Sequence, residues 1–182
     1  MGSPPLVRAM RLDAVAGALP VMEDALRREF EARLADSSTL AIRVAFSVLR
    51  QREDAEDVAQ EAFIRAYRHF GRLRDRDRFR SWVVRATWRL AIDRQRSDRR
   101  RALREQVVHQ ETTIPRSEDR ATALWEAIDM LPRKLRIVLV LSGIEGHDVA
   151  EVASLLGIPQ GTVKSRLFRA RQLLKEVLRG IR

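Results

Sequence analysis

The chain has 182 residues, with 35 Lys and Arg against 25 Asp and Glu, so its formal net charge at pH 7 is +10. This excess of cations favours a polyanionic partner, either a nucleic acid or an anionic membrane surface. There is no cysteine, which excludes a disulfide framework and a cysteine-based zinc site and suits a reducing cytoplasm. The longest clean apolar run, Ile137–Leu141, is far shorter than the roughly 20 residues of a membrane-spanning helix, so we expect no membrane insertion.

Helix-forming residues dominate the chain and strand signals are almost absent, so the sequence predicts an all-α protein. The amphipathic patterns fall into two blocks, residues 21–96 and residues 121–182. Between them, residues 97–120 are polar, highly charged and interrupted by Pro115. We therefore expect two small helical domains joined by a flexible linker, each with a core that is marginal by itself.

Residues 54–68 of the first block carry an acidic helix face. Asp54, Asp57 and Glu61 recur at helical spacing, and Glu61 can pair with Arg65 at i,i+4. Two interpretations are open: a solvated face that favours the helix dipole, or a docking surface for a basic protein. Spacing alone favours the solvated face. The opposite side is slim and apolar, with Ala55, Ala59, Ala62 and Ala66.

A second helix is predicted over residues 79–96, with Phe79, Val83, Ala86 and Leu90 as its core stripe. An indole among guanidinium groups suits single-stranded nucleic acid, because bases stack on the ring while arginines follow the phosphates. Each tryptophan, Trp82 and Trp88, could equally be a packed core residue. The residues of the neighbouring stripe are Arg78, Trp82, Arg85, Arg89 and Arg96.

The segment from residue 148 to residue 171 predicts a helix-turn-helix. Ala153, Gly157 and Val163 stand where two helices joined by a tight turn need a small contact residue, a left-handed backbone and an apolar plug. Asp148 can cap the first helix, and the second is predicted to begin near Gly161. Such a helix can read the DNA major groove, whereas the alternative is a solvated basic helix that closes a small bundle. The residues expected to point outward are Lys164, Ser165, Phe168, Arg169, Arg171 and Lys175.

Together these segments resemble the extracytoplasmic-function sigma factors of bacterial RNA polymerase, in the sigma-70 family. Residues 54–68 resemble region 2.2, residues 79–96 resemble regions 2.3 and 2.4, and residues 131–174 resemble region 4. The resemblance implies that residues 21–96 form sigma region 2, residues 97–120 a linker and residues 121–182 sigma region 4. It also implies a cytoplasmic initiation factor that binds core polymerase and directs promoter recognition and melting, with no catalytic residue, metal or cofactor of its own.

The resemblance assigns site residues to three surfaces, and it makes an anti-sigma factor an expected further partner. Contact with the clamp helices of the largest polymerase subunit falls to Asp54, Asp57, Gln60, Glu61, Phe63 and Arg65. Contact with the −10 element and its unstacked base falls to Leu73, Arg74, Phe79, Trp82, Arg85 and Arg89. Reading of the −35 element falls to Lys164, Ser165, Arg166, Phe168 and Arg169, and the surrounding surface is expected to engage the polymerase flap. Arg89 stands where the family usually has Asn, which leaves the base preference of that pocket open.

Other functions have weaker support in the sequence. The three histidines are isolated, and HExxH, P-loop and nucleophile motifs are absent, so an enzyme is not expected. Paired acids such as Asp54 and Asp57 could hold Mg²⁺ in a nuclease, but a face of carboxylates is more often solvated or a docking surface. The main alternative is a conventional helix-turn-helix regulator that binds DNA without replacing the sigma subunit, and a basic RNA-binding protein is a third.

Overall fold

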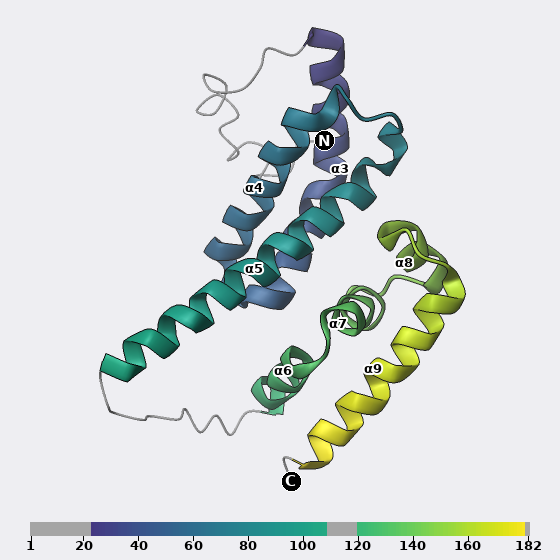
Figure 1. The fold of residues 1–182 in the computed structure, drawn as a ribbon. Helices are drawn as coiled ribbons and strands as arrows, with labels where there is room; N and C mark the ends of the chain where they lie inside the picture. The colour runs from purple at the N-terminus through teal and green to yellow at the C-terminus, as the bar shows by residue number, and fades with distance from the viewer. Residues whose placement is uncertain (1–22, 109–119, 181–182) are drawn as a thin grey trace. The chain divides into compact units, whose positions relative to one another are not determined.

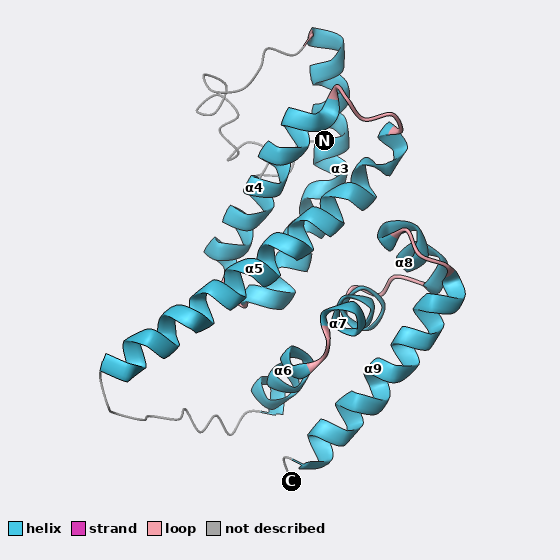
Figure 2. Cartoon of the chain, viewed as in Figure 1, coloured by secondary structure: helices cyan, strands magenta, loops and turns pink. Residues whose placement is uncertain are grey.

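The structure, a computed structural model, describes residues 23–108 and 120–180. Every regular element in these two ranges is helical, and no strand occurs in them (Figure 2). The chain divides into two compact units, one ending at Ile92 and the other beginning at Asp93 (Figure 1). The predicted all-α class is therefore confirmed.

The first unit is built on a helical hairpin of α3 (Asp24–Leu49) and α4 (Arg52–Phe70), followed by the 3₁₀ turn η2 (Arg76–Arg78) and the start of α5 (Phe79–Val108). The alanine stripe predicted for α4 is buried, so α3 and α4 can approach closely. Three phenylalanines, Phe30, Phe70 and Phe79, close the end of this core. Their rings meet edge to face with centroids 5.2 to 5.6 Å apart, a geometry that aromatic pairs prefer.

Helix α5 is longer than the sequence predicted. It continues to Val108, whereas we expected the helix to end at Arg96 and a flexible linker to start at Ser97. The reason is intrinsic propensity: residues 99–108 are rich in Arg, Ala, Leu, Glu and Gln, and no proline interrupts the chain before Pro115. High charge alone did not break the helix. The remainder of the predicted linker up to residue 119 lies outside the described residues.

The buried side of α5 also differs in part from the predicted stripe. Phe79 and Val83 are buried as expected, but Ala86 and Leu90 are only half-buried. The buried side of α5 is wider than the predicted stripe, because the helix lies against the hairpin of α3 and α4. It also includes positions one or two residues after those of the predicted stripe. The further buried residues on α5 are Ser81, Val84, Thr87, Trp88, Ala91 and Ile92.

The second unit contains α6 (Arg120–Met130), α7 (Arg133–Leu139), the π-helical turn η3 (Val140–Ile144), α8 (Val149–Leu156) and α9 (Gln160–Gly180). Its apolar core includes Ile128, Leu131 and Val138. A buried charge accompanies it: Arg136 is 6% exposed and pairs with Asp129 at 3.3 Å while donating to the Leu131 carbonyl at 3.2 Å. These bonds satisfy carbonyls where α6 ends and so fix the α6–α7 corner.

The connection between α3 and α4 contains a left-handed residue. Arg50 ends α3 with φ 61° and ψ 0°, and it is the one non-glycine residue with positive φ in residues 23–108 and 120–180. In this conformation the β-carbon of a non-glycine residue lies too close to the carbonyl oxygen that follows it, which costs about 1 to 2 kcal/mol. Glycine adopts it without that strain.

Arg50→Gly is therefore expected to stabilise the first unit by up to about 1 kcal/mol, because relief of strain outweighs the loss of the part-buried hydrogen bond from Arg50 Nε to the Ser47 carbonyl. Urea unfolding followed by circular dichroism measures the change. Arg43→Gly, at an exposed position inside α3, is the matched control and should destabilise by about 1 kcal/mol. A loss of stability in both variants would contradict the argument.

Candidate protein-binding and nucleic-acid-binding surfaces

The predicted helix-turn-helix is present in the second unit, and its turn has the expected backbone. Asp148 caps α8: its carboxylate accepts from the Glu151 N–H at 2.8 Å, and Glu151 accepts from the Asp148 N–H at 3.0 Å. This reciprocal capping box satisfies two N–H groups at the start of the helix. At the other end, Gly157 has φ 66° and Ile158 N–H donates to the Ala153 carbonyl. The chain therefore leaves α8 in a left-handed turn and enters α9 at once.

Helix α9 separates an apolar side from a basic side. Val163, Leu167 and Ala170 are buried, so they fix the rotation of the helix about its own axis. The helix begins at Gln160, one residue before the predicted start. Of the residues predicted to read the −35 element, four are exposed and Arg166 is half-buried; the exposed ones are Lys164, Ser165, Phe168 and Arg169. Phe168, at 65% exposure, is a large aromatic side chain in solvent. The exposed cations Lys164, one helical turn before it, and Arg169, the next residue, are its neighbours in the sequence.

The backbone of this turn can be tested by stability. Gly157→Ala should destabilise the second unit by about 1 kcal/mol or more, because a β-carbon is strained at positive φ. Gly161→Ala is the control, since a β-carbon there meets no atom within 4 Å and alanine favours the helix by up to about 1 kcal/mol. Thermal unfolding should move in opposite directions for the two variants, and equal shifts would contradict the assigned turn.

The acidic face of α4 lies on the solvent side of the helix. Asp57 and Arg65 are exposed, and Asp54, Gln60 and Glu61 are half-buried. Glu61 pairs with Arg65 at 2.7 Å, as the i,i+4 spacing predicted. These five residues, which we call the α4 acidic face, form one continuous side of the helix because 54, 57, 61 and 65 recur at helical spacing.

One predicted member of this surface lies elsewhere. Phe63 is 2% exposed and belongs to the core cluster with Phe30, Phe70 and Phe79, so its expected direct contact with a partner is wrong. The physical reason is its position on the same side as Ala59 and Ala66, which the hairpin buries. Phe63 supports the α4 acidic face from behind.

The residues predicted for the opened DNA strand divide between core and surface. Arg74 and Arg89 are exposed, while Leu73, Trp82 and Arg85 are half-buried. Phe79, in contrast, is 1% exposed within the aromatic cluster, so its predicted contact with DNA is wrong; it anchors the first turn of α5. We call Leu73, Arg74, Trp82, Arg85 and Arg89 the loop–α5 surface.

A tilted pair of aromatic rings and a group of neighbouring cations distinguish the loop–α5 surface. The Trp82 ring lies 6.4 Å from the His69 ring, centroid to centroid, with the planes inclined by 33°. Burial lowers the pKa of the Arg85 guanidinium, and repulsion from Arg78 and Arg89 lowers it further. A site where cations repel one another before any ligand binds is suited to a polyanion, whose phosphates relieve that repulsion.

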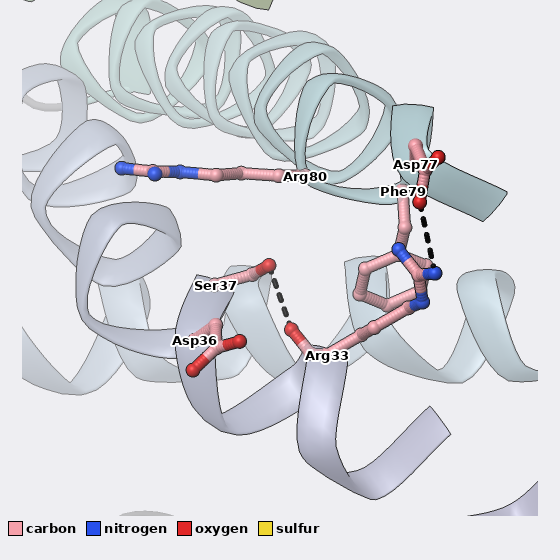
Figure 3. Close-up of a pocket in the computed structure, with 6 residues that line it drawn as sticks. All are labelled: Arg33, Asp36, Ser37, Asp77, Phe79 and Arg80. Carbon is pink, nitrogen blue, oxygen red and sulfur yellow. Dashed lines mark hydrogen bonds and ion pairs between the residues drawn. The ribbon is translucent and has the colours of Figure 1, made fainter. Parts of the chain in front are cut away.

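Sequence reasoning missed a polar network behind this surface, which ties α3 to the loop at η2. Arg33 donates to the Arg76 carbonyl at 2.6 Å, to Asp77 at 3.1 Å and to Glu29 at 3.1 Å, and Arg76 returns a bond to Glu29 at 2.7 Å (Figure 3 shows the bond to Asp77). The hydrogen bond to Asp77, and next the one to Glu29, raise the pKa of Arg33 above its ordinary value. In the sequence, the i,i+4 spacing of Glu29 and Arg33 is the one indication of this network.

Within residues 23–108 and 120–180 no cluster of three or more His, Asp or Glu side chains is arranged to hold a metal ion. In those same ranges no helix is both long enough and apolar enough to cross a membrane.

Comparison with known proteins finds family models that match two parts of the chain. Residues 35–101 match the family model of Sigma-70 region 2, and residues 121–174 match Sigma-70, region 4. The chain is 30% identical over 156 residues to the ECF RNA polymerase sigma factor SigW of Bacillus subtilis, covering 76% of this chain and 82% of that protein. It is 33% identical over 147 residues to the RNA polymerase sigma-H factor of Pseudomonas aeruginosa, covering 71% and 75%.

Solved structures agree with these sequence matches. The structure of CnrH in complex with the cytosolic domain of CnrY has a TM-score of 0.60 and 26% identity, with 96% of this chain and 98% of that chain covered. The sigma factor RpoE from Bartonella quintana, in complex with the anti-sigma factor NepR, shares the fold at a TM-score of 0.52 and 22% identity, covering 85% and 99%. With both regions matched in order and relatives covered over most of their length, the chain belongs to the extracytoplasmic-function sigma factors of bacterial RNA polymerase.

Proposed function

We propose that this sigma factor docks on core polymerase through the α4 acidic face, captures the opened −10 element on the loop–α5 surface and reads the −35 element with the start of α9. The observation that carries the proposal is that one chain presents two exposed faces of opposite charge, one in each unit. The acidic face of α4 suits a basic protein surface, and the basic face of α9 suits DNA. We propose residues 21–96 as sigma region 2 and residues 121–182 as region 4, and the helical extension of α5 takes up the first part of the expected linker.

The α4 acidic face is proposed to contact the clamp helices of the largest polymerase subunit. Its rigid placement supports this role, because the opposite side of α4 is locked by buried alanines and by Phe63. A rigid helix presents its carboxylates in a fixed pattern, which lowers the ordering cost of binding. The pair between Glu61 and Arg65 is exposed and contributes little to folding, so both groups remain available to a partner.

The loop–α5 surface is proposed to hold the opened strand of the −10 element. Removing a base from the duplex stack costs a few kcal/mol, which stacking and phosphate contacts must offset. Trp82 supplies a half-buried aromatic ring, Arg85 a half-buried cation, and Arg74 and Arg89 supply exposed cations.

The start of α9 is proposed to enter the major groove at the −35 element. The exposed residues Lys164, Ser165, Phe168 and Arg169 occupy its first turns, the part that a recognition helix presents to bases. The surrounding surface of the second unit is proposed to engage the polymerase flap. The chain is proposed to act in the cytoplasm as a binding factor, with catalysis supplied by the polymerase. An anti-sigma factor is a further proposed partner, by analogy with the complexes of CnrH and RpoE.

Run-off transcription tests the proposal directly. Purified bacterial core polymerase is combined with a promoter fragment selected by the complex, with and without the full chain. We expect transcripts only when the chain is present. A conventional helix-turn-helix regulator would bind duplex DNA by itself and leave core polymerase inactive, and that result would overturn the proposal.

Asp57→Lys should weaken binding to core polymerase by at least about tenfold, because it places a cation at the centre of the acidic face. Fluorescence anisotropy of the labelled chain with increasing core enzyme measures the affinity. Glu56→Lys makes the same charge change on the same helix, about 100° around from Asp57, where Glu56 pairs with Arg52 at 2.8 Å. Equal losses in the two variants would mean that overall charge, and no specific face, governs binding.

Arg169→Ala should reduce the preference of the polymerase complex for its −35 sequence by about 1 to 3 kcal/mol, as expected for a base contact. Binding to core polymerase should change little, since Arg169 is an exposed residue of the proposed DNA-reading side of α9 and lies outside the α4 acidic face. Competition between matched and scrambled −35 fragments measures the preference. Lys175→Ala, farther along α9, is the control and should leave the preference unaltered while weakening binding to both fragments slightly.

A further inference from the structure

The loop that carries the proposed −10 contacts has apolar anchors only at its two ends. Phe70 precedes it and Phe79 follows it, and both are fully buried in the aromatic cluster. Leu73 packs against that cluster near the first end. Residues 74–78 have no buried side chain, so packing does not fix the middle of the loop.

An open cavity of about 380 Å³ lies between α3 and this part of the chain. Arg33, Asp36 and Ser37 line it from α3, and Asp77, Phe79 and Arg80 line it from the η2–α5 corner (Figure 3). Arg80 points away from Asp77, whereas Arg33 reaches Asp77 directly. Apart from the packing of Phe79 in the aromatic cluster, polar contacts connect the two walls at this edge.

Arg33 provides those contacts through all parts of its guanidinium group. Nη1 donates to the Arg76 carbonyl at 2.6 Å, Nη2 donates to Asp77 Oδ1 at 3.1 Å, and Nε donates to Glu29 Oε1 at 3.1 Å. The second oxygen of Glu29 accepts from Arg76 Nη1 at 2.7 Å. The planar fork of arginine makes this set of bonds directional, which lysine could not reproduce.

Three further contacts join the turn at η2 to this network. Asp75 accepts from the Asp77 N–H at 3.1 Å and pairs with Arg78 at 2.9 Å. The Arg76 guanidinium lies over the Phe70 ring at 5.5 Å. The backbone of the turn is thus held from α3, and the ion pair with Asp75 holds the Arg78 side chain against it.

We propose that Arg33 and Glu29 are positioning residues for −10 recognition: from α3 they fix the η2 turn so that the loop meets the opened promoter strand in one orientation. Neither residue touches DNA in this role. The inference rests on the proposed function of the loop–α5 surface. It predicts that breaking the network slows promoter melting without weakening attachment to core polymerase, because the α4 acidic face is held by the separate alanine stripe.

The experiment uses the full chain with core polymerase and a selected promoter carrying 2-aminopurine in its −10 element. Melting is followed by fluorescence at core concentrations that saturate each variant, and core affinity and thermal unfolding are measured in parallel. Arg33→Gln should melt the promoter about tenfold more slowly, since small errors in placing a reactive contact cost large factors in rate. Arg33→Lys should restore only part of the rate, because it keeps the charge and loses the fork.

Asp77→Asn breaks the same network from the loop, at a side chain that is 92% exposed and remote from the core. It should slow melting about threefold, and the double variant with Arg33→Gln should be no slower than Arg33→Gln alone, because the two residues act through one contact. Arg27→Gln is the matched control: Arg27 lies on the same helix and pairs with Glu31 at 3.0 Å. It should melt the promoter as the original chain does.

The outcomes separate the possibilities. Melting at the original rate in Arg33→Gln and Asp77→Asn overturns the inference. Loss of core affinity or unfolding at the assay temperature in Asp77→Asn would assign the network to folding alone and also overturns it. If the original chain fails to melt any promoter with core polymerase, the proposed function itself is wrong, and that failure is recognised before any variant is compared.

Discussion

The first unit depends on the burial of three phenylalanines from three different helices. Phe30 of α3, Phe70 at the end of α4 and Phe79 at the start of α5 meet edge to face, each pair adding about 0.5 to 1.5 kcal/mol beyond simple burial. Because α4 must end and α5 must begin at this cluster, residues 71–78 have to leave the core and return to it within a short distance. The packing of the core therefore requires this exposed loop and fixes the position of both its ends.

The same helices serve the core and the surface, and small residues make this possible. Alanines on the inner side of α4 let it lie close to α3 without bulky side chains, so the carboxylates on its outer side stand on a rigid support. Helix α9 follows the same rule with Val163 and Ala170 inside and Lys164 and Arg169 outside. In each case the buried apolar stripe fixes the rotation of the helix about its own axis. That rotation determines which charged side chains face the solvent, where a partner can contact them.

Local patterns predicted the features that depend on local physics. The capping box at Asp148, the left-handed Gly157 and the buried stripe of α9 follow from neighbouring residues, so the helix-turn-helix was predicted from the sequence and confirmed. Phe63 and Phe79 were misplaced because an aromatic residue inside a functional motif carries the same sequence signal whether it packs inward or contacts a ligand. The bonds from Arg33 to residues 76 and 77 could not be predicted, since they join segments more than 40 positions apart, as their separations of 43 and 44 residues record.

Exposed cations give the surfaces of the two units a common property. In the first unit, burial lowers the pKa of Arg85, and the neighbouring charges of Arg78 and Arg89 lower it further. A polyanion that binds beside such cations releases counterions, so this kind of binding weakens as salt rises. The α4 acidic face interrupts this basic character with a cluster of carboxylates on one helix. A carboxylate surface repels a polyanion and attracts cations, so the charges on α4 and on α9 suit partners of opposite sign.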